Sequence, residues 1–364
     1  MKLHVVNLVT LLTVSFAIGF AQEGEVTLLF AGDAMQHTPQ FYAAKTDSGY
    51  NYNAVFELVN KKISNAVIAC VNFETTLGGK PYTGYPLFSS PNEYAIALKD
   101  AGFDVFFTAN NHSLDTGSKG LEHTIRVIKE IGAKQTGTFV SKQKRDITYP
   151  LMIIKNGIRI AFLNYTYGTN GLLTKKPNVI NLIDTLIIKE DLKTAQLLNP
   201  DILIAVMHWG EEYHTKPSNK QKETAEFLLQ NGVRIIIGHH PHVVQSVQIN
   251  KINGNIESTV FYSLGNFVSN QRKLNTDGGM LAEIVIKKNT NDASINIESV
   301  DYSFVWVHKY FEKGKPVYRL LPISKEDSIY NEIINENKYN LQLYEHAAMK
   351  RFVKSAIKSA NFSF

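Results

Sequence analysis

The amino-acid sequence predicts an α/β protein with a largely buried sheet, and two features of the chain support this. Between residues 26 and 240, short runs rich in Val, Ile and Phe alternate with amphipathic stretches of helical spacing. Such alternation is typical of a mainly parallel sheet covered by helices. After residue 240, strand-like segments follow one another with few helices between them. This change predicts a second, partly antiparallel set of strands that completes a sandwich.

The elements of the first part follow in order. Short apolar runs predict buried strands at residues 26–31, 66–71, 104–109, 159–164, 202–207 and 234–238. Helical spacing predicts helices at residues 54–64, 91–101, 118–131 and 218–232. In the last of these, Ala225, Leu228 and Leu229 form one apolar stripe, and Gly232 ends the helix.

The C-terminal part is predicted to contain mainly strands, followed by one helix. Strands are expected at residues 260–262, 280–287 and 295–307, with a turn at 276–279. A helix is expected within 325–357, which is rich in Lys, Glu, Asn and Tyr. We therefore expect a main domain over residues 25–285 and a C-terminal strand and helix extension over 286–364, which packs on the domain or follows it.

The first 21 residues have the pattern of a secretory signal peptide. Lys2 supplies a positive charge before an apolar stretch, and Gly19 and Ala21 are small residues at the −3 and −1 positions of a cleavage site. An uncleaved membrane anchor is the alternative, but the apolar stretch is shorter than the roughly 20 residues that span a bilayer. We expect cleavage after Ala21 and export of a soluble protein to the periplasm or the extracellular space.

Composition and charge exclude several classes of protein. The chain is 44% hydrophobic and 20% charged, which excludes a disordered, collagenous or coiled-coil protein. Its 38 Lys and Arg residues exceed its 33 Asp and Glu residues by only five, without a long basic run, so nucleic acid is not an expected partner. The single cysteine, Cys70, excludes an intramolecular disulfide and a cysteine-based metal site.

Polar residues follow the carboxyl ends of five predicted strands. The residues concerned are Asp33, Glu74, Asn110 to His112 with Asp115, His208, and His240 with His242. In open α/β sheets, ligands bind at this edge. Each residue alone has a simpler interpretation: a strand-end Asp is commonly a turn or cap residue, and a lone His is often a packed core residue. The joint pattern favours a site.

These residue types also suit one another chemically. Carboxylates, an amide oxygen and imidazoles form the mixed ligand set of Zn, Mn or Fe. A bridging carboxylate can hold two such cations about 3.5–4 Å apart, where they bind a phosphoryl group and lower the pKa of a bound water. An unliganded His nearby can then protonate the leaving oxygen. The sequence therefore predicts a site for one or two divalent metal ions.

Six sequence blocks resemble those of a known family. The blocks are GDAM at 32–35, NFET at 72–75, ANNHSLDTG at 109–117, HWGEEY at 208–213, GHHPH at 238–242 and YSLGNF at 262–267. They resemble the CapA family of capsule or poly-γ-glutamate synthesis proteins, within the calcineurin-like metallophosphoesterase superfamily. The resemblance implies a four-layer α/β/β/α sandwich, which agrees with the pattern of strands.

The resemblance also implies roles for individual residues. Asp33 and His242 correspond to ligands of a first metal, Glu74 to the bridging carboxylate, and Asn111, His208 and His240 to ligands of a second metal. His112 corresponds to the general acid or phosphate-contacting residue, and Asp115 is a second candidate catalytic residue. The same blocks place Glu212, Tyr213 and Asn266 where substrate would bind.

Two positions depart from the superfamily pattern. Its first motif is Asp-x-His, and Met35 stands at the His position; a thioether is a poor ligand for a hard or borderline cation, so the first metal is expected to bind weakly or be missing. Glu74 stands in place of a bridging Asp and moves the carboxylate by about 1.5 Å, one C–C bond.

Two functions remain open at this point. The first is metal-dependent hydrolysis of a phosphoester in the synthesis or processing of a capsule-like polymer of the poly-γ-glutamate type. The second is a non-hydrolytic, polymer-binding or assembly role with a degenerate metal site. The expected partners are an anionic envelope polymer or a phosphoester substrate, together with membrane proteins of polymer synthesis.

Overall fold

The computed structural model describes residues 24–323, 341 and 343–363. The predicted signal peptide and most of the N-terminal half of the helix predicted at 325–357 lie outside the described residues. Among the described residues, no helix combines the length and the apolar character needed to cross a bilayer.

One half of the structure is a sheet centred on β1. Its strands are β1 (Gly24–Ala34), β2 (Ile68–Phe73), β3 (Val105–Phe107), β4 (Lys134–Thr136), β14 (Gly278–Lys288), β15 (Ile295–Glu312) and β16 (Lys315–Ile323). The strands from β1 to β4 are parallel, whereas β14, β15 and β16 continue the sheet antiparallel on the other side of β1. β13 (Asn266–Val268) pairs parallel with the end of β1.

The other half is a sheet centred on β9 and β10. Its strands are β6 (Leu151–Lys155), β7 (Ile158–Thr166), β9 (Ile202–His208), β10 (Ile235–His239), β11 (Val247–Ile252) and β12 (Asn255–Phe261). β7, β9, β10 and β12 are parallel, and β6 and β11 pair antiparallel at the two ends. A pairing of Ile256 with Ile297 links the two halves into one hydrogen-bonded path, and β5 (Thr138–Phe139) with β8 (Val179–Ile180) forms a separate small sheet.

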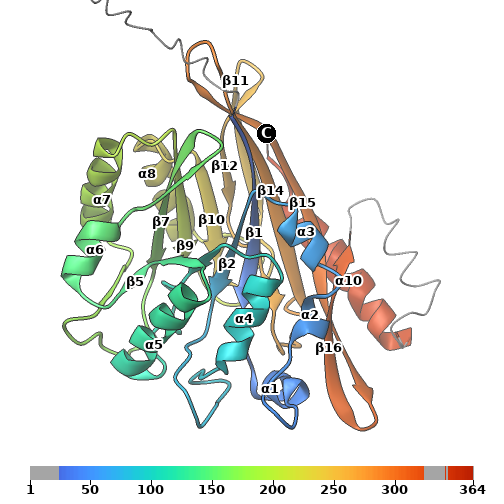
Figure 1. Ribbon diagram of the computed structural model, residues 1–364. Coiled ribbons are helices and arrows are strands. Elements are labelled where there is room, and N and C mark those ends of the chain that lie inside the picture. The colour runs from blue at the N-terminus through green and yellow to red at the C-terminus, as the bar shows by residue number, and fades with distance from the viewer. Residues whose placement is uncertain (1–23, 324–340, 342, 364) are drawn as a thin grey trace, which may run out of the picture.

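Helices cover the outer faces of both halves (Figure 1). The first half carries α1 (Thr38–Ala44), α2 (Asn53–Phe56), α3 (Asn60–Ser64), α4 (Asn92–Asp100) and α5 (Gly117–Glu130). The second half carries α6 (Lys142–Thr148), α7 (Thr185–Leu197) and α8 (Asn219–Gln230). The last described helix is α10 (Leu343–Ala360), whose Met349 and Phe352 are buried in the core between the sheets.

Alternating side chains divide the interior into three cores. In β1, Val26, Leu28 and Phe30 face the core between the sheets, whereas Leu29 and Ala31 face the helices. β7 and β9 alternate in the same way between the central core and the core beneath α7 and α8. Because successive strand residues point to opposite faces, this division follows from the apolar runs themselves. The predicted α/β/β/α sandwich is therefore confirmed.

The expected elements are found, with some differences. The six predicted buried strands are β1, β2, β3, β7, β9 and β10, and each predicted helix after 90 and before 240 is present. The single helix expected at 54–64 is instead two short helices, α2 and α3, because a turn at 57–59 interrupts the helical hydrogen bonding. β14 continues past residue 285, where the main domain was expected to end. β15, β16 and α10 belong to the expected C-terminal extension, and they complete the sandwich.

Candidate metal centre

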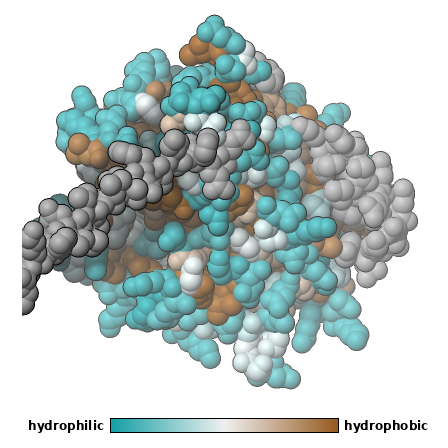
Figure 2. Space-filling view, turned by 45° about the horizontal axis from the view of Figure 1, so that its top comes forward, coloured by the Kyte–Doolittle hydropathy of each residue, from teal (hydrophilic) through white to brown (hydrophobic). Residues whose placement is uncertain are grey.

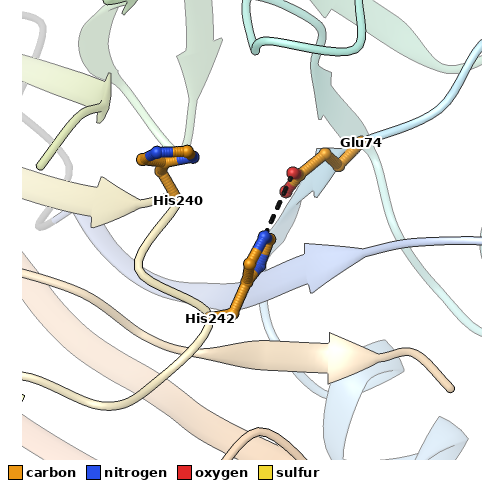
Figure 3. Close-up of side chains that lie close together, drawn as sticks. All are labelled: Glu74, His240 and His242. Atoms are coloured by element: carbon orange, nitrogen blue, oxygen red, sulfur yellow. Dashed lines mark ion pairs between the residues drawn. The ribbon is translucent and has the colours of Figure 1, made fainter. Parts of the chain in front are cut away.

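The predicted site residues meet at the carboxyl ends of the parallel strands. Asp33 is the second-last residue of β1, Glu74 directly follows β2, and His208 is the last residue of β9. His240 and His242 lie in the turn after β10. All five side chains are at least 96% buried. Figure 3 shows Glu74, from the segment after β2, near His240 and His242, which lie on one loop after β10.

Local backbone features bring these segments together. A Cβ at Gly32 would lie 2.0 Å from the carbonyl oxygen of Gly265, so only glycine permits the close approach that seats Asp33. His240 and His242 have φ angles of 97° and 59°, in the left-handed region that side chains rarely adopt. Such conformations cost about 1–3 kcal/mol each and persist at functional sites. Here they direct two imidazoles into the site.

Asp33 is the centre of the first group. Its Oδ2 lies 3.1 Å from His242 Nδ1, and its Oδ1 lies 3.2 Å from His239 Nδ1 and accepts a 2.8 Å bond from Asn72 Nδ2. Burial would raise the pKa of Asp33, but the hydrogen bonds and charges of His239 and His242 outweigh it and hold that pKa well below its usual value. Asp33 is therefore an ionised carboxylate at neutral pH.

Glu74 lies between the two groups of ligands. Its Oε1 is 3.8 Å from both His208 Nε2 and His242 Nε2, and its Oε2 accepts a 3.2 Å bond from Asn72 Nδ2 (Figure 3). Burial, reinforced by the negative charge of Asp33, raises the pKa of Glu74 well above its usual value. A buried carboxyl group in this state would gain most from a cation placed beside it.

Asn111 and His208 form the second group with His240. Asn111 Oδ1 lies 2.8 Å from His208 Nε2, and the rings of His208 and His240 are 4.8 Å apart. Burial, followed by the charge of His240, lowers the pKa of His208 well below its usual value. Burial lowers the pKa of His240 to about 3. Both imidazoles are therefore neutral at neutral pH, the form that binds metal.

The donor set fits a divalent cation. Donor atoms of Glu74, His240 and His242 lie within 4.8 Å of one another, and so do those of Asp33, Glu74 and His208. Glu74 Oε1 and His240 Nδ1 are buried and have no hydrogen-bond partner among the described residues. A buried polar atom without a partner costs about 1–3 kcal/mol, and a bound cation would satisfy both. Mixed N and O donors suit Mn, Zn or Fe.

His112 and Asp115 form a hydrogen-bonded pair next to the predicted ligands. His112 Nδ1 lies 2.7 Å from Asp115 Oδ2, which also accepts a 2.7 Å bond from the backbone N–H of Phe88. The ring of Phe88 meets the His112 ring edge to face at 4.6 Å. With Nδ1 held by Asp115, Nε2 is the His112 atom left to exchange a proton.

The three predicted substrate-binding residues differ in position. Glu212 is exposed and Tyr213 is half-buried, with its ring 6.1 Å from that of His242 and under Lys273 Nζ at 3.7 Å. Asn266 is fully buried behind His242: its Oδ1 lies 3.1 Å from His242 Nδ1. Glu212 and Tyr213 thus lie at the solvent-facing rim of the candidate metal centre, whereas Asn266 orients the predicted metal ligand His242.

Four residues that touch the predicted ligands were not anticipated. Asn72 bonds to both carboxylates, and His239 approaches Asp33 as described above. The ring of Tyr167 lies 4.5 Å from that of His240, and Asn170 Oδ1 accepts a 3.2 Å bond from Asn111 Nδ2. Asn72 and His239 lie within the quoted sequence blocks. Because alternate strand residues point to the same face, the spacing of Asn72 and Glu74 could have predicted that their side chains lie together. The loop with Tyr167 and Asn170 carries no such pattern.

Comparison with known proteins identifies relatives over most of the chain. A family model described as "Bacterial capsule synthesis protein PGA_cap" matches residues 27–271. The capsule biosynthesis protein CapA of Bacillus anthracis is 31% identical over 73% of this chain and 65% of its own length. The PGA biosynthesis protein CapA of Bacillus subtilis (strain 168) is 29% identical over 71% of this chain and 67% of its own length. This chain thus spans about two thirds of these relatives.

Similarity to solved structures is weaker. The calcineurin-like phosphoesterase YfkN of Bacillus subtilis is 13% identical, with a TM-score of 0.48 over 93% of this chain and 98% of that chain. The NAD nucleotidase NadN of Haemophilus influenzae is 12% identical, with a TM-score of 0.46 over 93% of this chain and 68% of that chain. The family match covers all six sequence blocks quoted above. The CapA resemblance is thus confirmed: the chain belongs to the bacterial capsule synthesis protein family PGA_cap.

Proposed function

We propose that this protein is an exported, metal-dependent hydrolase that cleaves a phosphoester in the synthesis or processing of a capsule-like envelope polymer of the poly-γ-glutamate type. One observation carries the proposal. Asp33, Glu74, Asn111, His208, His240 and His242 converge from distant segments. Two of their buried donor atoms, Glu74 Oε1 and His240 Nδ1, lack hydrogen-bond partners among the described residues. Unsatisfied buried polar atoms destabilise a protein core, so this arrangement is better explained by the binding of a ligand than by packing.

The same residues would hold one or two divalent cations, with Glu74 between the two groups. A bound cation supplies a water of lowered pKa and neutralises charge on the phosphoryl oxygens. In hydrolysis a bond from the water oxygen to phosphorus would replace the bond from phosphorus to the leaving oxygen, and the proton that the water loses would pass to solvent. His112 Nε2 donates its proton to that leaving oxygen, and Asp115 Oδ2 holds Nδ1–H and stabilises the charged imidazole.

The rim supports an anionic substrate in part. Lys273 lies over the ring of Tyr213, close to His242, and would attract a negatively charged polymer or phosphoester toward the site. We propose that such a polymer is the partner, handled together with membrane proteins of its synthesis, and that residues 1–21 direct export to the periplasm or the extracellular space.

A non-hydrolytic accessory role is the second candidate, and Met35 favours it. The residue is buried directly after β1, and it offers a thioether in place of an imidazole. A first site without its usual imidazole would hold metal weakly. The protein would then bind polymer through the rim without cleaving it.

Metal content and aryl phosphate hydrolysis separate these functions. We expect purified wild-type protein to contain metal, and to hydrolyse p-nitrophenyl phosphate with Mn²⁺ but not with EDTA. Asp33→Ala and His240→Ala should each lose at least about 100-fold in rate, because each removes a charge or ligand that stabilises the transition state. His214→Ala is the matched control, since that imidazole is largely exposed at the rim. Equal inactivity of wild type and variants, with no bound metal, would reject hydrolysis and favour the accessory role.

A further inference from the structure

A second recess lies beside the metal centre. It is a pocket of about 570 Å³ between α1 and the loop of residues 78–87. Tyr42 of α1 and Tyr82 and Tyr85 of the loop line it, and Asp115 and Thr116 form its wall toward the metal centre. Its volume is in the range of pockets that enclose small molecules.

The loop is fixed against its surroundings. Thr83 and Ser89 exchange backbone hydrogen bonds of 3.0 and 2.9 Å at its base. Gly84 N donates a 3.1 Å bond to Thr38 Oγ1, and a Cβ at Gly84 would lie 2.4 Å from Thr38 N. The close approach requires glycine and holds the loop on α1. The pocket walls are therefore preformed, which lowers the entropic cost of binding.

The pocket is linked directly to the catalytic pair. Phe88, at the end of the loop, donates its backbone N–H to Asp115 Oδ2 and packs its ring on His112. Asp115 Oδ1 is buried and has no hydrogen-bond partner among the described residues, although Asp115 lines the pocket. The Asp115 side chain has no exposed surface, so this carboxylate lies behind the pocket wall, where it holds His112.

The lining suits an uncharged ring that carries hydroxyl groups. Lys80 and Asp115 are the charged residues of the lining, and the Asp115 side chain is fully buried against His112. Tyr42 and Tyr85 are 61% and 73% exposed, so their ring faces are free to pack on a ligand. Aromatic faces pack on the C–H face of a sugar ring, while hydroxyl and carboxylate groups bond to its edge. A polyanion would meet only one lysine in this lining, Lys80.

We propose that this pocket binds the sugar ring of the substrate. It would hold the ring next to His112 while the phosphoryl group lies at the metal centre. The position of the phosphoryl group rests on the proposed function, whereas binding of the sugar ring does not. The substrate class is then a sugar phosphate or a glycosyl phosphodiester of the cell envelope.

Binding by metal-free protein tests the pocket separately from hydrolysis. Saturation-transfer NMR in EDTA would be recorded with N-acetylglucosamine, glucose and a γ-linked glutamate oligomer. We expect saturable binding of a neutral sugar, weakened at least tenfold by Tyr85→Ala and by Tyr42→Ala. Leu197→Ala is the control, because Leu197 is 85% exposed at the end of α7 and lies outside the pocket. Thermal unfolding would confirm that each variant is folded.

Each outcome is informative. Absence of sugar binding, or equal binding by wild type and both tyrosine variants, would overturn the proposal. Binding of the glutamate oligomer that both tyrosine variants weaken would overturn it in favour of a polyanion site. Sugar binding without any aryl phosphate hydrolysis would refute the proposed function alone, and hydrolysis without sugar binding would refute this inference alone.

Discussion

Replacing Asn72 by Leu tests whether the metal-free site is held together by one amide group. Asn72 Nδ2 donates to Asp33 Oδ1 at 2.8 Å and to Glu74 Oε2 at 3.2 Å. Leu has nearly the same shape but has no donor. The substitution therefore leaves two buried carboxyl groups facing each other without the group that lies between them.

The magnitude follows from the charge on each acceptor. Asp33 is ionised, because its pKa is well below the usual value, and a hydrogen bond to a charged group contributes about 1.5–3 kcal/mol. Glu74 has a raised pKa and tends to be neutral, so its bond contributes about 0.5–1.5 kcal/mol. Together they predict that Asn72→Leu lowers the free energy of unfolding by about 3 kcal/mol in EDTA.

Urea unfolding followed by circular dichroism measures this difference. Asn296→Leu is a control, because Asn296 is exposed on β15 and surface changes are usually within about 0.5 kcal/mol. Mn²⁺ should restore part of the lost stability by placing positive charge beside both carboxylates. A loss in EDTA no larger than that of the control would show that Asn72 does not organise the site.

Three further predictions concern the catalytic pair and the support of the site. Asn170→Ala frees the amide of Asn111 and should weaken metal binding about 10-fold or more, as measured by calorimetric titration; unchanged affinity would refute the role. Asp115→Asn should lower kcat for alkyl phosphates about 100-fold or more while KM changes little, because His112 loses its charged partner; an equal loss with p-nitrophenyl phosphate, whose leaving group needs no acid, would argue against proton donation. Gly32→Ala places a methyl group 2.0 Å from an opposing carbonyl oxygen and should lower Tm by several degrees; an unchanged Tm would contradict the close approach.

The sequence predicted that the site residues lie close together because the ends of the strands could be identified from their apolar runs. Asp33, Glu74 and His208 each follow or end an apolar run, and parallel strands bring their carboxyl ends to one edge. The three-dimensional structure adds the distances and the missing partners, which depend on loop paths. Tyr167 and Asn170 lie in a loop without periodicity, so their contacts with His240 and Asn111 could not be predicted.

Helix α7 is an element of the fold that could not be predicted from the sequence. Its apolar residues lie on more than one face: Leu186 and Leu197 are exposed, whereas Ile188 and Leu192 are buried. No single stripe marks such a helix, and the segment was not predicted to be helical. In contrast, β1 and β9 are buried on both faces, so their continuous apolar runs identify them without tertiary information.

The choice of amides around the ligands has a physical reason. Three asparagines each hold a different predicted ligand: Asn72 holds Asp33, Asn266 lies against His242, and Asn170 holds Asn111. A Lys or Arg in place of Asn72 would also donate to the two carboxyl groups, but its charge would repel the cation and oppose its binding. Asn266 and Asn170 accept hydrogen bonds through their amide oxygens, which Lys and Arg cannot do. A neutral amide orients the same atoms without that repulsion. The support of the site is thus compatible with a metal ion at every described contact, which a core built only for stability would not require.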